Sequence, residues 1–379
     1  MAPSSSPPTV PQNASESRNL SDRDEEAGNF QSVSIPESVD DLTAAWFESV
    51  LGGKVDAVKV LDAHSGTTGR ARIGLTGAPG IPDTVFVKLQ PFSPEQRSFL
   101  RKVGLGVAEA RLYEAVGNQL PVRVPHAWHA ECDPAEGTFV MVLEDLVASG
   151  CRFPAPADDD IVDVAGSLMD ELALLHATFR GRALPWLVRP EGMRRKPSDS
   201  EMAAQRTHFI KMGLDQFGAE MGPAFRALAD LYIERSGDVI GLYGKGEQTL
   251  AHGDDHVGNL FVDGARTGFY DWAVACRASG VRDVAYFLCN SLPVQIRRTE
   301  EGALLSRYRE ALAVHGWILD EKTVHQQYRL FSIYSWIAAV STAAMGSQWQ
   351  PVEVTRPALI STTAAIEDLD VMGLLSERL

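Results

Sequence analysis

The spacing of apolar residues changes part-way along this chain. In residues 55–146, short runs that alternate between apolar and polar residues are separated by glycine-containing turns, which is typical of β-strands. Helical spacing precedes them at 36–51 and interrupts them at 93–120, where we expect Gly104 and Gly106 to break the helix. The pattern therefore predicts a β-rich part that carries one helical insertion.

The rest of the chain has a different period. Apolar residues recur three and four positions apart at 161–181, at 200–237 and from 300 to the C-terminus, which predicts helices. The most apolar stretch, 331–346, contains several hydroxyl side chains and is shorter than the roughly 18–20 residues that span a bilayer. We therefore expect a buried core helix at 331–346 and no membrane span.

These patterns predict an α+β fold with two lobes. A small β-rich N-terminal lobe, residues 36–146, is followed by a larger, mostly helical lobe, residues 147–379, with a hinge near 144–150. Residues 1–35 are rich in Ser, Pro, Asn and acidic side chains and predict a disordered tail. Because this tail has neither a basic region nor an apolar stretch, we expect no secretory signal and a cytoplasmic protein.

Composition narrows the classes of partner. A formal charge of −15 and a pI near 5.1 argue against a nucleic-acid-binding surface, which needs clustered Lys and Arg. The four cysteines are scattered without a C-x-x-C pair, so we expect reduced thiols.

The candidate chemistry is concentrated in 251-AHGDDHVGNLFVDGARTGFYDWAVA-275. Its His and Asp residues have the ligand types of a metal hydrolase, although such an enzyme would need further ligands downstream. An ordinary polar loop is a second reading, since Asp and Asn are common in turns. A phosphotransferase is the third, because Asp254 and Asn259 have the H-x-D-x-x-x-x-N spacing of a kinase catalytic loop. Asp271 follows a hairpin-like segment, from which its carboxylate can meet the Asn259 amide oxygen across one Mg²⁺.

Two charged residues upstream favour the phosphotransferase reading. Lys88 lies in the strand-like run "VFVKL", whose alternation would turn it toward a cleft. Glu109 lies in a helical stretch from which it can pair with Lys88. Phosphoryl transfer needs a base, oxygen ligands for a divalent metal and a fixed cation for the phosphates, and these residues supply them in order.

These segments resemble a known group of enzymes. "VFVKL", "AEARLYEAV", "VMVLEDL", "LALLHATF", "HGDDHVGNLFV", "GFYDW" and "VRDVAYFL" are similar to the aminoglycoside phosphotransferase and choline-kinase-like superfamily. Within it, the chain most resembles bacterial relatives of the ecdysteroid-kinase-like group. The resemblance implies a bilobal protein-kinase-like fold that uses ATP and Mg²⁺ and phosphorylates a hydroxyl of a small-molecule acceptor.

The resemblance also implies individual roles. Asp254 would accept or orient the acceptor hydroxyl, and Asn259 and Asp271 would hold Mg²⁺. Lys88 would contact the α- and β-phosphates, positioned by Glu109. The backbone of the hinge, which includes Glu144 and Leu146, would read the adenine edge. His252 and Asp283 would brace the catalytic loop, and His176 is expected to be a packed helix residue.

Two positions depart from the family pattern. "SGTTGR" is not a G-x-G-x-x-G loop, so phosphate cover would come from Gly66, Thr67, Thr68 and Gly69, with Arg70 as an added cation or a plain surface residue. Asp255 stands where an apolar residue is usual, and it would either hydrogen-bond locally or face the acceptor.

The acceptor stays open among aminoglycosides, amino alcohols, sugars and sterol-like alcohols. Trp336 and Trp349 are candidates for its binding wall, although both also suit a core. The acidic runs 158–160 and 300–301 favour a cationic acceptor or are solvated faces. A protein kinase is disfavoured because "RDVAYFL" leaves no room for a long activation loop after Asp271. The alternative to a small-molecule kinase is a catalytically inactive, nucleotide-binding regulatory module.

Overall fold

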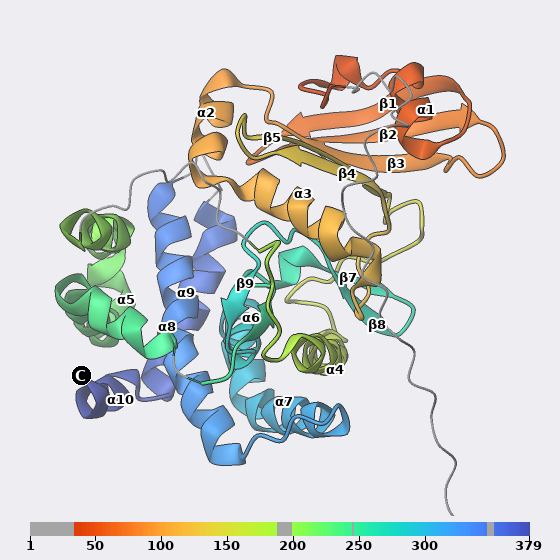
Figure 1. Cartoon of the computed structure of the whole chain (residues 1–379). Coiled ribbons are helices and arrows are strands. Elements are labelled where there is room, and N and C mark those ends of the chain that lie inside the picture. The colour runs from red at the N-terminus through yellow and green to blue at the C-terminus, as the bar shows by residue number, and fades with distance from the viewer. Residues whose placement is uncertain (1–33, 188–198, 245, 347–351) are drawn as a thin grey trace, which may run out of the picture. The chain divides into compact units, whose positions relative to one another are not determined.

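Five antiparallel strands form the sheet that the alternating pattern predicts (Figure 1). They lie in the order β1-β2-β3-β5-β4. Their bounds are β1 (Val55–Ser65), β2 (Gly69–Gly77), β3 (Thr84–Leu89), β4 (Ala127–Asp133) and β5 (Thr138–Glu144).

The computed structural model describes residues 34–187, 199–244, 246–346 and 352–379. Contacts divide the chain into Met1–Ser34 and Ile35–Leu379, and every helix and strand below belongs to the second unit. The predicted tail therefore falls almost wholly outside the described residues.

The two faces of the sheet contribute to different cores. Val85 and Val87 of β3 pack with Trp46 and Phe47 of helix α1 (Ala44–Leu51). The sequence predicts a helix from residue 36, but only a 3₁₀ turn, η1 (Val39–Asp41), precedes α1. The longer helix is wrong because the Thr43 side chain accepts from the Trp46 amide at 3.2 Å, which caps α1 and fixes its start.

The helical insertion covers the opposite face of the sheet. It consists of α2 (Pro94–Val103) and α3 (Leu105–Val116), followed by η2 (Gly117–Gln119). Gly104, at φ 70°, separates the two helices as predicted. Gly106 does not break the helix: it lies inside α3 and allows the Phe139 ring of β5 to approach the helix backbone closely.

Helices make up most of the remaining chain, as the spacing predicts for 161–181, 200–237 and the stretch from 300, whereas α6 (Val281–Ser291) was not predicted. They are α4 (Ile161–Phe179), α5 (Asp199–Tyr243), α6 (Val281–Ser291), α7 (Val294–Val314), α8 (Glu321–Met345), α9 (Val352–Asp368) and α10 (Val371–Arg378). α5 is kinked at Gly222, which has φ 90° and precedes Pro223. The stretch 331–346 falls in α8, where Phe331 and Trp336 are buried, so the predicted core helix is confirmed.

Two short pairs of antiparallel strands carry the candidate site. β6 (Thr249–Ala251) pairs with β9 (Cys276–Ala278), and β7 (Leu260–Asp263) pairs with β8 (Arg266–Phe269). The 3₁₀ turn η3 (Val257–Asn259) precedes β7. The five-stranded sheet and the largely helical region that follows confirm the predicted α+β fold. None of the helices among the described residues is both long and apolar enough to cross a bilayer.

The close contact at Gly106 yields a stability test. A Cβ at position 106 would lie 2.1 Å from Phe139 Cε1, so we expect Gly106→Ala to destabilise the fold by about 1–3 kcal/mol. A Cβ added at Gly302 in α7 would have no neighbouring atom within 4 Å. Gly302→Ala should therefore stabilise the fold by about 0.5–1 kcal/mol. Urea unfolding of both variants checks this, and equal free energies of unfolding would contradict it.

Candidate active site

A tight backbone turn begins the loop between β6 and η3. Gly253 has φ 86°, and a Cβ there would lie 2.6 Å from the carbonyl oxygen of Val274. A residue with a side chain would therefore be strained and also clash with backbone. Glycine at this position places Asp254 directly after the turn.

Asp283, in the first turn of α6, holds this loop in place by hydrogen bonds to its backbone. Its carboxylate accepts from the amide of His252 at 2.7 Å and from the amide of Gly253 at 3.1 Å. The same carboxylate lies 3.2 Å from His176 Nε2 of α4. Burial alone would raise the pKa of Asp283, but the hydrogen bond and charge of His176 outweigh it and lower the pKa.

His252 supports the loop from its own side chain. It is fully buried, and its Nε2 lies 3.1 Å from the Tyr270 carbonyl, while its Nδ1 accepts from the Asp254 amide at 3.3 Å. Burial lowers the pKa of His252, so the ring is neutral, with the proton on Nε2. His252 thereby connects the Asp254 loop to the segment that carries Asp271.

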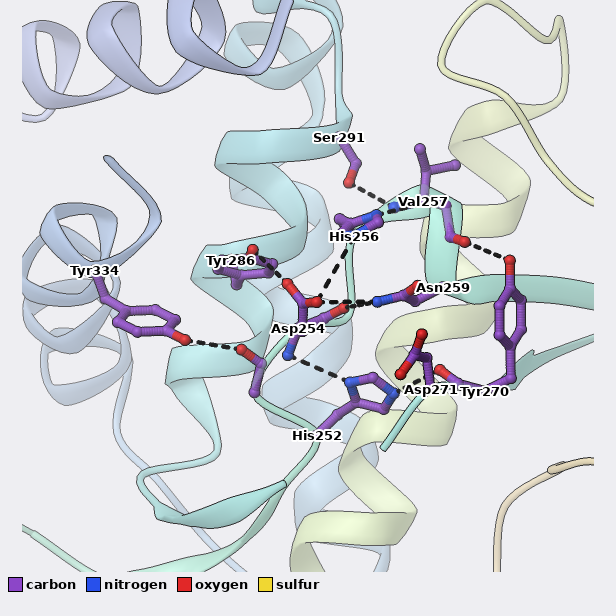
Figure 2. A network of polar contacts seen from close by, with 12 residues as sticks. His252, Asp254, His256, Val257, Asn259, Tyr270, Asp271, Tyr286, Ser291 and Tyr334 are labelled. Carbon is purple, nitrogen blue, oxygen red and sulfur yellow. Dashed lines mark hydrogen bonds and ion pairs between the residues drawn. The ribbon is translucent and has the colours of Figure 1, made fainter. Parts of the chain in front are cut away.

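The Asp254 carboxylate is held at both oxygens (Figure 2). Tyr286 of α6 donates its hydroxyl to Oδ1 at 2.6 Å, and Asn259 Nδ2 donates to Oδ2 at 3.2 Å. The side chain is still 36% exposed, so a ligand can reach it. An oriented, accessible carboxylate of this kind can accept a proton from a bound hydroxyl.

Asn259 and Asp271 lie on one side of Asp254, while Tyr286 lies on the other (Figure 2). Asn259 Nδ2 also donates to the Asp254 carbonyl at 2.8 Å, which leaves the Asn259 amide oxygen as the atom able to ligate a cation. The Tyr270 amide donates to the Asn259 carbonyl at 3.1 Å and so brings Asp271 alongside. Asp271 has φ 64°, an unusual conformation for a residue with a side chain.

A buried charge cluster joins the sheet to this region. Lys88 of β3 forms an ion pair with Glu109 of α3, and its Nζ lies 3.3 Å from Asp271 Oδ1. Glu109 also accepts from the Trp272 amide at 3.3 Å. Burial alone would lower the pKa of Lys88, but the carboxylates of Asp271 and Glu109 outweigh it and raise the pKa, so Lys88 stays charged. Burial alone would raise the pKa of Asp271, which Lys88 and Arg70 nevertheless lower.

Strand register places further polar groups beside Lys88. Arg70 of β2 is the direct partner of Lys88, and its Nη2 lies 3.8 Å from Asp271 Oδ2. Thr68 comes immediately before β2 and Gln90 immediately after β3, two residues from Arg70 and Lys88 respectively. Both are buried, yet neither the Thr68 hydroxyl nor the Gln90 amide has a hydrogen-bond partner among the described residues.

The predicted phosphate loop is short. Gly66 and Thr67 are exposed, and the Gly66 amide donates to the Thr68 carbonyl at 3.0 Å. Gly69 begins β2, where a Cβ would lie 2.3 Å from the Gln90 carbonyl oxygen. The loop is therefore packed against the segment that follows β3, and its exposed tip consists of Gly66 and Thr67.

The predicted hinge residues Glu144 and Leu146 lie at the end of β5 and two residues beyond it. Glu144 forms an ion pair with Arg123 at 2.7 Å, which lowers the pKa of Glu144 to about 2 against the opposing effect of burial. The Glu144 amide donates to the His126 carbonyl at 2.8 Å, and the Leu146 carbonyl accepts from the Cys151 amide at 2.9 Å. These two backbone atoms are thus already used within the protein.

Comparison with known proteins identifies the family. The family model described as the ecdysteroid kinase-like family matches residues 81–320, which is more than half of the 379-residue chain. The chain belongs to the ecdysteroid kinase-like family. The resemblance to the ecdysteroid kinase-like group that the sequence indicates is confirmed.

Solved structures support the fold of this ecdysteroid kinase-like chain. A protein from Ralstonia eutropha assigned as an aminoglycoside phosphotransferase matches with a TM-score of 0.50 and 15% identity, over 86% of this chain and 97% of its own. Choline kinase from Cryptosporidium parvum matches with a TM-score of 0.50 and 10% identity, over 86% of this chain and 92% of its own. No curated protein matches the chain.

Several residues of the ecdysteroid kinase-like site were missed from the sequence. Tyr286 and Arg282 are four residues apart on α6, and the i, i+4 spacing in "RDVAYFL" is the signal that places them on one face. Tyr334 of α8 donates its hydroxyl to the Gly253 carbonyl at 2.9 Å, and no local motif indicates this. Gln90 follows Lys88 by two residues, and this spacing is a signal that could have brought it to attention.

Other candidate residues have different positions. Trp336 is fully buried against Phe225 and belongs to the core, while Trp349 lies outside the described residues. Asp255 is also fully buried, so it does not face the acceptor, and neither of its oxygens has a hydrogen-bond partner in the part of the chain that the structure describes. The metal-hydrolase reading needs three or more His, Cys, Asp or Glu ligands together, and no such group occurs among the described residues.

The isolated Asp255 carboxyl predicts a pH-dependent stability. Burial raises the pKa of Asp255 well above its usual range, and the charge of Asp283 adds to this. Since the unfolded carboxyl ionises near pH 4 and the folded one resists ionisation, Asp255 increasingly disfavours folding as the pH rises from about 4 toward its folded pKa. We expect Asp255→Asn to be more stable than the natural protein at pH 7, by about 1–3 kcal/mol, with the gain shrinking toward pH 4.

Thermal unfolding between pH 4 and pH 8 measures this effect. Asp159→Asn is the matched control because Asp159 is exposed, and it should leave the pH dependence unchanged. A stability difference for Asp255→Asn that does not vary with pH would contradict the prediction.

Proposed function

We infer that this chain transfers the γ-phosphoryl group of ATP to a hydroxyl of a small-molecule acceptor. Membership in a family of small-molecule kinases supports this inference. The observation that carries it is a series of contacts. Lys88 of β3 lies beside Asp271, the neighbouring Tyr270 amide donates to the Asn259 carbonyl, and Asn259 donates to Asp254. A fixed cation, oxygen ligands and an accessible carboxylate are the parts that phosphoryl transfer requires.

Asp254 is the proposed base. As the acceptor oxygen forms its bond to the γ-phosphorus, the bond from that phosphorus to ADP breaks and the hydroxyl proton passes to Asp254. Tyr286 and Asn259 hold the carboxylate at both oxygens, so that it is oriented before the acceptor binds. Since the transition state of such transfers is loose, orientation and charge neutralisation supply most of the rate.

Lys88 is the proposed phosphate cation, and Glu109 fixes its position. The ion pairs with Glu109 and Asp271 hold the ammonium on two sides, and its third hydrogen would be available to a phosphate oxygen. Arg70 lies directly across the strand pair and would add a second positive charge. Gly66, Thr67, Thr68 and Gly69 would cover the phosphates, and the unpartnered Thr68 hydroxyl and Gln90 amide suit the same ligand.

Asn259 and Asp271 fit a magnesium site. Mg²⁺ in nucleotide sites is held by one or two protein oxygens together with phosphate oxygens and water, and these two side chains offer that number. The commitment of Asn259 Nδ2 to Asp254 leaves its carbonyl oxygen for the metal. When bound, Mg²⁺ would neutralise charge on the phosphates.

The remaining assignments concern the two lobes. Residues 36–146 would bind the nucleotide and residues 147–379 would supply catalysis and the acceptor wall. The backbone of Glu144–Leu146 would contact the adenine edge, through atoms other than the Glu144 amide and the Leu146 carbonyl, which are already hydrogen-bonded.

Replacing the proposed base tests the inference. We expect Asp254→Asn to lower kcat by about 10²–10⁴-fold while leaving the Kd for Mg·ATP unchanged, because only proton transfer to position 254 is lost. Mg²⁺-dependent ATP consumption with a panel of amino alcohols, aminoglycosides, sugars, sterol-like alcohols and hydroxy acids supplies the rate, and calorimetry supplies the Kd. Unchanged turnover in Asp254→Asn would refute the assignment. Nucleotide binding without turnover on any acceptor would favour the inactive regulatory module.

Tyr286 gives a second test, of carboxylate orientation. Tyr286→Phe removes one hydrogen bond to a charged group, so we expect kcat to fall about tenfold with little change in KM for ATP. Tyr328→Phe is the matched control, because the Tyr328 hydroxyl donates to the carboxylate of Glu301 at 2.7 Å, a contact outside the proposed site. The test compares kcat and KM of the two variants with those of the natural protein. Equal losses of kcat in both variants would show a general packing effect.

A further inference from the structure

Arg282 contacts Tyr334 and Cys276 beside the proposed site. It occupies the first turn of α6, and its Cζ lies 3.8 Å from the centre of the Tyr334 ring. Its Nη1 donates to Cys276 Sγ at 3.0 Å. The guanidinium is therefore held in place by an aromatic face and a thiol.

A short chain of contacts connects this guanidinium to Asp254. The Tyr334 hydroxyl donates to the carbonyl of Gly253, the residue before Asp254, and the Tyr334 ring lies 5.5 Å from the ring of Tyr286. Tyr286 donates to the Asp254 carboxylate. Figure 2 shows both tyrosines on the side of Asp254 opposite Asn259 and Asp271. If the phosphates and the metal occupy the Asn259 side, an acceptor has to approach from the tyrosine side.

The charge of the neighbouring Asp283 favours the charged form of Arg282, but the two side chains form no ion pair. Within the described ranges no carboxylate forms an ion pair with it, and its buried Nε has no hydrogen-bond partner. The neighbouring Asp283 carboxylate already binds two backbone amides and His176. The Asp255 carboxyl makes no hydrogen bond to any described residue. Partly buried arginines usually pair with an anion, so an anionic ligand is the missing partner.

The same arrangement disfavours a cationic acceptor. A quaternary or primary ammonium is commonly recognised on aromatic faces, but the Tyr334 ring already carries the guanidinium of the protein itself. Three of the five carboxylates in the acidic runs that favour a cationic acceptor already form ion pairs. Asp158 and Asp160 form ion pairs with Arg152, and Glu301 forms one with Arg297.

We propose that the acceptor carries an oxyanion, a carboxylate or a phosphate, which binds Arg282 while the acceptor hydroxyl faces Asp254. This assignment rests on the proposed kinase function and narrows its substrate class from any alcohol to hydroxy acids or phosphorylated alcohols. Arg282 selects the acceptor by charge and takes no part in proton transfer.

Acceptors that differ only in charge test the proposal. Linear ω-hydroxy compounds of increasing chain length are each supplied as carboxylate, phosphate monoester, neutral amide and amine. For every length, kcat/KM is measured with Mg·ATP, and binding is measured by thermal shift in the presence of Mg·ADP. We expect the best anionic compound to exceed the amine of equal length by about tenfold or more in kcat/KM, and the carboxylate and phosphate series to show which oxyanion fits.

Variants of Arg282 show whether that residue causes the preference. Arg282→Gln should abolish the difference in kcat/KM between anionic, neutral and cationic acceptors, and Arg282→Lys should retain part of it. The Kd for Mg·ATP should stay unchanged in both variants. Arg277→Gln is the matched control, because Arg277 is an exposed arginine on the adjacent β9 and should keep the natural preference. The thermal midpoints of the variants without ligand establish that each one is folded.

The outcomes separate the proposal from the kinase function. A preference for the amine or the amide, an equal or absent response to all charge states, or an order that survives in Arg282→Gln would each overturn the proposal. Loss of turnover in Asp254→Asn together with any of these results would leave the kinase function standing. Anion binding that depends on Arg282, without phosphorylation of any acceptor, would uphold the anion site and remove the kinase function.

Discussion

The buried ion pair between Lys88 and Glu109 is the contact on which the site depends. It joins a strand to the helix that covers the sheet, and Glu109 also accepts from the Trp272 amide beside Asp271. One carboxylate therefore connects β3, α3 and the segment that follows β8. Taking such charges out of water is costly, and removing one partner of a buried pair typically costs about 3–5 kcal/mol. The pair is consequently better explained by the positions it fixes than by any net stabilisation.

Asp283 performs a similar task for the catalytic loop. By accepting from two consecutive amides and from His176, it holds the turn at Gly253 from the first turn of α6. Asp283 binds the backbone at residues 252 and 253, and His252 contacts the carbonyl of Tyr270. These hydrogen bonds allow the unusual φ of 64° at Asp271. The two anchors act on opposite ends of the segment 252–271. Its functional side chains are thus positioned before any ligand arrives, which is the condition for catalysis by orientation.

The parts that could be predicted from the sequence are those encoded by local spacing. The alternation of apolar and polar residues predicted the strands, and the spacing of Asp254 and Asn259 predicted the loop that carries them. Both patterns depend only on residues that are near one another in the chain. The start of α1 was misjudged because one threonine side chain decides it. Gly106 was taken for a helix breaker because its reason, the Phe139 ring, comes from a distant strand.

The acceptor side escaped sequence analysis for the same reason. Tyr286 and Tyr334 meet only because α6 and α8 pack together, and neither belongs to the catalytic motif. In the sequence Asp255 stands where an apolar residue is usual in the family that the chain resembles, but whether it hydrogen-bonds locally or faces the acceptor stayed open. Its isolation becomes visible once the side chain is placed in the interior.

Charge distribution explains how an acidic chain can bind anionic ligands. The net charge of −15 describes the whole chain, yet cations stand on both sides of Asp254. Lys88 and Arg70 lie next to Asp271 on one side, and Arg282 lies over Tyr334 on the other. Asp158 and Asp160 share ion pairs with one arginine, Arg152, whereas Arg282 forms no ion pair with an acid among the residues that the structure describes. A positive charge that is held in place without an ion pair is where the proposed anion would bind, because the local field and not the net charge governs recognition at short range.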